Sequence, residues 1–215
     1  MRLQIDRFIL GDFQTNCYVV RADESATECL VVDAGLDADE LIDFLKQHRL
    51  NPVATLLTHG HVDHIVGVAA MRRCFPQTKV HIHRLDATML TNPRANLSAL
   101  AGMTFAVEPA EVLLEDGGTV DQAGTRLKVL HTPGHTPGGI CLYAESDGVV
   151  FAGDTLFADS VGRTDFPGGD TSQLIQSIRS KLLSLPDETA VYPGHGMRTT
   201  IGRERRANPF LTGRE

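Results

Sequence analysis

The chain has no tryptophan, few aromatic residues (6%) and only four cysteines among its 215 residues. The cysteines, Cys17, Cys29, Cys74 and Cys141, form no C-x-x-C pair, which disfavours a thiolate-rich structural zinc site. Each lies in an apolar context. We therefore expect four buried free thiols rather than a disulfide framework.

The sequence is also poor in basic charge and in long apolar runs. Lys and Arg number 20 against 27 Asp and Glu, a net charge of -7, so no basic surface is available for a nucleic-acid backbone. No apolar run approaches the ~20 residues of a membrane-spanning helix, and residues 1–6 show no signal-peptide pattern. We expect a cytoplasmic protein without nucleic-acid or membrane partners. The hydrophobic content of 42% suffices for the core of one domain over residues 1–215.

What the chain does contain is a dense histidine segment, residues 58–64 (THGHVDH). The apolar run 53–57 before it predicts a buried strand, and residues 65–70 after it predict the start of a helix. The polar side chains would then lie at the carboxyl end of a strand, where open α/β sheets form ligand sites. Because imidazoles and a carboxylate are costly to bury unpaired, a divalent metal site is favoured over a solvated histidine-rich turn.

Three further turns carry His or Asp, and each follows an apolar strand. Each candidate ligand is flanked by Gly or Pro, which let the backbone turn sharply toward a shared point. Four strand ends that carry His or Asp indicate a shared metal site more strongly than any one turn does. The three turns are residues 131–138 (HTPGHTPG), 153–155 (GDT) and 193–196 (PGHG).

Together the turns read T-H-x-H-x-D-H, H-x-P-G-H-T-P-G, G-D and P-G-H-G, which resembles the metallo-β-lactamase fold superfamily. Residues 161–170 (VGRTDFPGGD) make the chain similar to the short glyoxalase II-like, or hydroxyacylglutathione hydrolase-related, hydrolases. The resemblance extends from about residue 13 to residue 211. It implies an α/β (α+β) fold, a four-layer α-β-β-α sandwich of two mixed β-sheets with helices on the outer faces. Periodicity alone predicts only a mixed α/β fold.

Individual elements follow from periodicity and turn residues. Residues 94–109 show no clear period, and members of the superfamily often place a loop or small helix there, over the site. Helices are predicted over residues 39–48, 65–74, 171–183 and 199–207. Five strands of a second sheet are predicted at residues 112–114, 119–120, 125–130, 139–143 and 148–152.

The resemblance implies seven metal ligands: His59, His61 and His135 for one ion, Asp63, His64 and His195 for a second, and Asp154 as the bridge between them. Two divalent ions are thus implied, with zinc as the expected metal and iron or manganese as alternatives. Mixed nitrogen and oxygen ligands leave room for water, as in a catalytic site. Asp63 is also a candidate proton acceptor.

The implied activity is that of a metal-dependent thioesterase. It would hydrolyse S-acylglutathione, notably S-lactoylglutathione, or related small-molecule thioesters through a metal-bound hydroxide. Only twenty residues follow His195, so we expect no C-terminal glutathione-binding helical extension of the kind that full-length glyoxalase II enzymes carry. The chain is expected to be a monomer or a small homo-oligomer.

Three alternatives stay open at this stage. A mononuclear-iron persulfide dioxygenase would use the equivalents of His59, His135 and Asp154, but such enzymes usually read P-A-H-D where residues 193–196 read P-G-H-G. A β-lactamase is disfavoured because such enzymes are usually exported. A non-catalytic metal-binding module is disfavoured because all seven ligand positions are filled.

Three residues outside the ligand set are candidates for supporting roles. Arg163 either pairs with Asp165 to stiffen its loop or holds a substrate carboxylate. Asp33 follows a buried strand, and we expect it to contact a metal ligand or to fix a turn. His131 is expected to be structural, with a contact to a metal ligand as the alternative.

Overall fold

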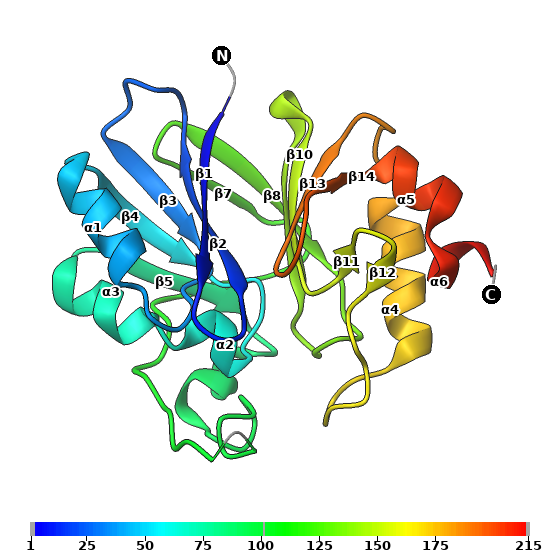
Figure 1. Ribbon diagram of the computed structural model, residues 1–215, viewed down its shortest axis with the longest axis horizontal. Helices are drawn as coiled ribbons and strands as arrows, with labels where there is room; N and C mark the ends of the chain where they lie inside the picture. Colours follow the sequence, from blue (N-terminus) through cyan, green and yellow to red (C-terminus); the bar gives the residue numbers. More distant parts are fainter. Residues whose placement is uncertain (1–2, 101, 214–215) are drawn as a thin grey trace.

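A computed structural model describes residues 3–100 and 102–213 of the chain. Two six-stranded β-sheets lie against each other, and helices cover the outer face of each (Figure 1). This is the four-layer α-β-β-α sandwich that the resemblance implies. The ends of the predicted domain, residues 1–2 and 214–215, lie outside the described residues, as does residue 101.

The first sheet has the strand order β1-β2-β3-β4-β5-β6. The pairs β1–β2 and β2–β3 are antiparallel, whereas each pair from β3 to β6 is parallel, so the sheet is mixed. The placement of residues 112–114 in the second sheet was wrong, because they pair with β5, Val112 opposite His81. The strands are β1 (Gln4–Leu10), β2 (Thr15–Arg21), β3 (Glu28–Val32), β4 (Asn51–Leu56), β5 (Lys79–His83) and β6 (Val112–Leu114).

The second sheet has the order β14-β13-β10-β9-β8-β7. All its pairs are antiparallel except β10 with β13. A separate hairpin of β11 (Leu156–Phe157) and β12 (Ser160–Val161) follows β10. The strands of the sheet are β7 (Thr119–Gln122), β8 (Thr125–His131), β9 (Ile140–Ala144), β10 (Val149–Gly153), β13 (Ala190–Pro193) and β14 (Thr199–Thr200).

Helices on the first sheet are α1 (Asp39–Gln47), α2 (Val62–Ile65) and α3 (Val68–Cys74). The helix predicted over residues 65–74 is divided at Gly67. A Cβ atom there would lie 2.5 Å from the carbonyl oxygen of Gly35, so the close backbone approach requires glycine. The free thiol of Cys74, at the end of α3, is exposed, contrary to the prediction, whereas the other three cysteines are buried.

Helices on the second sheet are α4 (Thr171–Ser177), a π-helical turn η3 (Ile178–Leu182), α5 (Ile201–Ala207) and α6 (Pro209–Thr212). Asp170 caps α4 through the backbone N–H of Gln173 at 3.0 Å. The predicted helix 199–207 begins only at Ile201, because the two residues before it pair with β13. Short 3₁₀ turns are η1 (Ala87–Thr91) and η2 (Glu145–Asp147).

Three buried apolar layers hold these elements together. The inner layer lies between the sheets and includes Tyr18, Leu56 and Phe151, and the two outer layers lie under the helices. Removing apolar side chains from water is the main driving force for this packing. Within residues 3–100 and 102–213, no helix combines the length and the apolar character that crossing a bilayer requires.

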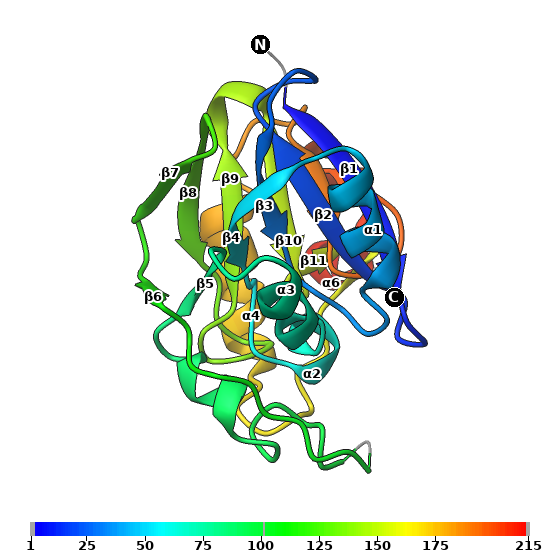
Figure 2. The same cartoon turned by 90° about the vertical axis from the view of Figure 1, so that its left-hand side faces the viewer.

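The segment between β5 and β6 extends beyond the ends of the sheets, as the green chain at the bottom of Figures 1 and 2 shows. It contains η1 and the irregular residues 92–100 and 102–111. The turns after β4, β8, β10 and β13 belong to two different sheets, and the sandwich brings them together near this segment.

Candidate metal centre

All seven residues of the predicted ligand set meet where these four turns converge. Each is held by the turn or helix that follows a strand, as the sequence pattern predicts. His59 and His61 follow β4, Asp63 and His64 begin α2, His135 follows β8, Asp154 follows β10 and His195 follows β13.

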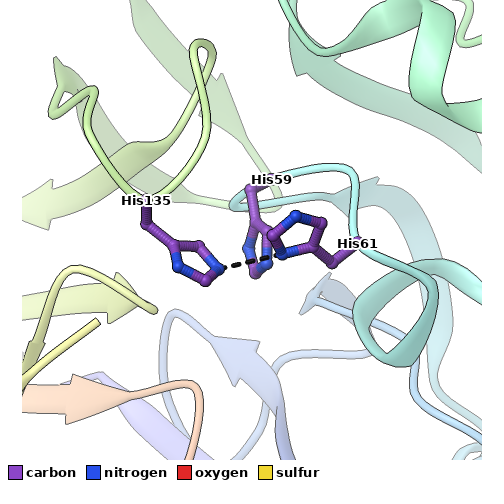
Figure 3. Close-up of side chains that lie close together, drawn as sticks. All are labelled: His59, His61 and His135. Atoms are coloured by element: carbon purple, nitrogen blue, oxygen red, sulfur yellow. Dashed lines mark hydrogen bonds between the residues drawn. The ribbon is translucent and has the colours of Figure 1, made fainter. Parts of the chain in front are cut away.

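His59, His61 and His135 form the first group of side chains. One nitrogen of each ring lies within 4.8 Å of the others. The closest pair is His61 Nδ1 and His135 Nε2, at 2.9 Å. Figure 3 shows the three rings turned toward one another, His59 and His61 from the loop after β4 and His135 from the loop after β8. All three side chains are buried.

Asp63, His64 and His195 form the second group, again with ligand atoms within 4.8 Å of one another. His195 Nε2 lies 3.1 Å from Asp63 Oδ2 and 3.3 Å from His64 Nε2. Three nitrogen and oxygen atoms at this spacing match the ligand types that zinc or iron accepts.

The carboxylate of Asp154 lies between the two groups. Its Oδ1 is 3.4 Å from His64 Nε2. Its Oδ2 is 3.6 Å from His135 Nε2 and 3.6 Å from His195 Nε2. One carboxylate therefore reaches a histidine of each group, which is the position expected of a bridging ligand.

Orphaned polar atoms show that a cation fits this centre. His59 Nε2, His61 Nε2 and Asp154 Oδ1 are buried and have no hydrogen-bond partner among residues 3–100 and 102–213. Such atoms are costly unless something else satisfies them. Gly194 makes room for the cluster, because a Cβ atom there would lie 2.2 Å from Asp154 Oδ1. The unsatisfied atoms belong to residues of the candidate ligand set, so the residues present fit divalent metal ions.

The protonation states favour metal binding at the first group. Burial lowers the pKa of His59 well below its ordinary value, and the neighbouring histidines act in the same direction. Burial, with His135 next, lowers the pKa of His61 to about 3. Neutral imidazole is the form that binds a metal ion.

At the second group the carboxylates are ionised. Burial is the largest single effect and opposes their charge, but His64 and the other histidines together outweigh it and lower the pKa of both Asp63 and Asp154. The pKa of His64 is raised, because Asp63, Asp154 and Asp33 outweigh the opposite effect of burial. The surroundings of His64 thus favour positive charge, which a metal ion would supply in place of a proton.

Asp33 orients His64 from outside the cluster. Its Oδ2 lies 2.9 Å from His64 Nδ1, and its two oxygens accept from the backbone N–H and the hydroxyl of Thr58, both at 2.8 Å. Asp33 therefore contacts a candidate ligand and also fixes the turn that carries His59, as expected from its position after β3.

Asp86, which the sequence analysis did not single out, joins two of the ligand turns. Its Oδ2 accepts from the backbone N–H of Gly60 at 3.2 Å and from the hydroxyl of Thr136 at 2.7 Å. Its Oδ1 accepts from the backbone N–H of Gly138 at 2.6 Å. Burial raises the pKa of Asp86. The only sequence signal was an isolated Asp in a helical turn, which does not reveal partners so distant in the chain.

The ring of His131 contacts His83 and Pro137. Its ring stacks on His83 with centroids 4.2 Å apart, and its Nε2 lies 2.9 Å from the carbonyl oxygen of Pro137. Within the described part of the chain it makes no hydrogen bond to any of the seven candidate ligands. The alternative that it supports a metal ligand is therefore wrong, because its ring is turned toward β5 instead.

Arg163 makes the internal pair that the sequence suggested. Its Nε and Nη2 donate to the carboxylate of Asp165 at 2.8 and 2.7 Å. Its carbonyl oxygen lies 2.7 Å from His135 Nδ1, so the backbone of the same residue orients a candidate ligand. A side-chain contact with substrate remains a prediction.

A cavity of about 550 Å³ opens directly above the cluster. Five of the seven candidate ligands line it: His61, Asp63, His135, Asp154 and His195. A cavity of this size can hold a small molecule, and an ion held by the cluster would face it.

A family model described as the metallo-beta-lactamase superfamily matches residues 10–195. The chain belongs to this superfamily. Its fold and its cluster of histidine and aspartate side chains are those of a metallo-hydrolase of the superfamily that binds divalent metal ions.

Relatives in sequence extend over almost the whole chain. An uncharacterized protein of Mycobacterium leprae is 43% identical over 217 residues, which cover 97% of this chain and 99% of the relative. Hydroxyacylglutathione hydrolase GloC of Haemophilus influenzae is 37% identical over 201 residues, which cover 93% of each.

Similar solved structures confirm the fold. The BLEG-1 B3 metallo-β-lactamase superposes with a TM-score of 0.92 at 42% identity, covering 98% of this chain and all of that chain. TTHA1623 in a di-iron-bound form superposes with a TM-score of 0.84 at 39% identity, and the match covers 96% of this chain and 100% of that chain. ETHE1 from Myxococcus xanthus superposes with a TM-score of 0.78 at 29% identity, and the match covers 99% of this chain and 86% of that chain.

Proposed function

We propose that this metallo-hydrolase cleaves thioesters, S-acylglutathione among them, at a centre of two divalent metal ions with zinc as the expected metal. The observation that carries the proposal is the position of Asp154 within 3.6 Å of a histidine from each ligand group. The similarity to a hydroxyacylglutathione hydrolase over 93% of the chain supports the choice of thioesters.

In the reaction, water adds to the acyl carbon, the carbon–sulfur bond breaks, and a carboxylic acid and a thiol are released. Metal ions held by the seven ligands would acidify water and polarise the carbonyl. Because a thiol has a pKa near 8.5, its thiolate can leave without a strong acid on the protein.

The chain's own residues prepare the site for this reaction. Asp63 keeps a lowered pKa and lines the cavity, so its ionised carboxylate can accept a proton from the water that attacks. Asp33 holds the His64 ring through Nδ1, and the Arg163 carbonyl holds the His135 ring through Nδ1, so both rings present Nε2 to the cluster. Preorganised ligands of this kind avoid rearrangement during turnover.

The test is a parallel assay of one purified, metal-analysed preparation. The proposal expects steady release of thiol from S-lactoylglutathione or another S-acylglutathione, lost in an Asp154→Asn variant. Absence of thioester hydrolysis by the metal-loaded protein would overturn it. Oxygen consumption with glutathione persulfide instead would identify the mononuclear-iron alternative.

Hydrolysis of β-lactams is the second candidate, favoured by the 42% identity to a protein described as a B3 metallo-β-lactamase. The same preparation should be assayed with a β-lactam. The thioesterase proposal expects this activity to be weaker in kcat/KM than thioester hydrolysis, and the reverse order would favour the β-lactamase.

A further inference from the structure

The cavity above the cluster has mainly apolar walls opposite the ligands. Large apolar side chains come from four separate segments: Phe13 from the β1–β2 turn, Leu97 and Leu100 from the β5–β6 segment, Phe157 from β11 and Phe166 from the loop before α4. Two of these rings lie next to candidate ligands. Phe166 is 5.8 Å from His61, and Phe157 is 6.3 Å from His195, between ring centroids.

Some of these apolar side chains are unusually exposed. Phe13 is 45% exposed and Leu100 is 72% exposed. Large apolar side chains are normally buried, and an exposed group of them around a concave site marks a ligand surface. Here the exposed group is continuous with the metal centre, so a molecule in the cavity would cover it while its reactive group lies at the cluster.

Away from the candidate ligands, the cavity walls offer little to an anionic group. Among the described lining residues, Arg163 is the only Lys or Arg. Both of its hydrogen bonds to Asp165 are formed, and its guanidinium lies 3.9 Å from the centroid of the Phe166 ring. A substrate carboxylate would have to displace Asp165, whereas an uncharged group can pack on the Arg163–Phe166 face without cost to that pair.

We propose that this cavity binds the acyl group of the thioester and that the preferred acyl group is uncharged, apolar and larger than lactoyl. This inference rests on the proposed thioesterase function and adds the substrate class. The apolar walls would contribute binding energy in proportion to the area that the acyl chain buries. The thiol part then points outward, where the cavity opens.

The first experiment varies the acyl group on a constant thiol. S-acetyl-, S-butanoyl-, S-hexanoyl- and S-lactoylglutathione are compared with the metal-loaded protein. Each added methylene should raise kcat/KM about fourfold until the cavity is filled, and S-hexanoylglutathione should exceed S-lactoylglutathione. Hydrolysis of all four at equal efficiency, or a preference for lactoyl, would overturn this inference and leave the thioesterase function intact. No hydrolysis of any would overturn the function itself.

The second experiment measures binding without catalysis. S-hexylglutathione and S-methylglutathione are thioethers that cannot be hydrolysed, and calorimetry gives the affinity of the metal-loaded protein for each. We expect the hexyl compound to bind at least tenfold more tightly. Phe13→Ser and Leu100→Ser should reduce this ratio severalfold. Leu113→Ser, at a residue 56% exposed on β6 and outside the cavity, should not change it. Equal binding of the two thioethers by the unaltered protein would contradict the apolar pocket.

Discussion

The carboxylate of Asp33 lies 2.9 Å from Nδ1 of His64, and both side chains are buried. The contact fixes the ring so that Nε2 faces the metal centre. It also makes Nδ1 the hydrogen-bond donor, so that the lone pair of Nε2 can bind a metal ion.

Asp33→Asn should therefore weaken metal binding at the second group. An amide can keep the hydrogen bond from the Thr58 backbone, but it carries no charge to support the His64 ring. We expect a loss of about 10-fold to 100-fold in metal affinity, measured by competition with a chromogenic chelator. Asp43→Asn on the exposed face of α1 is the matched control. Equal affinities for all three proteins would show that Asp33 only shapes the turn.

Asp154→Asn should reduce metal content and thioester hydrolysis together. A neutral amide oxygen is a poorer ligand for a hard cation and does not offset the charge of two ions. Metal analysis after dialysis and a thiol-release assay measure the two effects. Unchanged turnover with unchanged metal content would place the bridge elsewhere.

Asp86→Ala should destabilise the fold as well as the site. The substitution leaves the N–H groups of Gly60 and Gly138 and the hydroxyl of Thr136 without their buried acceptor. The expected loss is about 3 kcal/mol in the free energy of unfolding, measured by urea denaturation of the metal-free protein. Asp86→Asn keeps an acceptor and should lose less. If the alanine variant is as stable as the unaltered chain, these bonds do not join the two turns.

Burial of His81 should make the stability of the metal-free protein fall in mild acid. Neither ring nitrogen has a hydrogen-bond partner in the described part of the chain, and burial lowers the pKa of His81 to about 4 from the ordinary value of 6.5. Since the unfolded chain takes up the proton first, this contribution to stability is complete above pH 6.5. It is lost as the pH falls from 6.5 toward 4.

The loss due to His81 between pH 7.5 and pH 5 should be about 2 kcal/mol. Urea denaturation at the two pH values measures it, and His81→Leu should remove that part of the difference. The same substitution at the exposed His48 is the control for loss of a histidine. An equal pH effect in the His81→Leu protein and the unaltered chain would contradict the assignment.

The sequence indicates which side chains meet at the cluster, because five of the seven candidate ligands stand beside glycine in a turn that follows an apolar strand. A strand followed by a glycine-containing turn is a local feature that the folded structure keeps. The structure brings His59, His135 and His195 together from three such turns. The four-layer fold came from the resemblance. Periodicity by itself did not separate the two sheets.

Contacts between residues that lie far apart in the chain could not be predicted from local sequence patterns. The pairing of β6 with β5 depends on which edge of which sheet is free, so residues 112–114 were assigned to the wrong sheet. Asp86 bonds to residues 26 and 52 positions away, and no local period encodes that. Leu97 and Leu100 belong to a segment without regular structure, so their place in the cavity wall follows only from the tertiary fold.

The most direct test of the account is a titration of the metal-free protein with a divalent ion, followed by metal content and by hydrolysis of one S-acylglutathione in the same samples. We expect saturation at two ions per chain, with activity rising as the second group fills. Asp63→Ala and His64→Ala should each lose the second ion and keep the first. If the protein never holds more than one ion and both variants keep full activity, the dinuclear thioesterase centre is wrong.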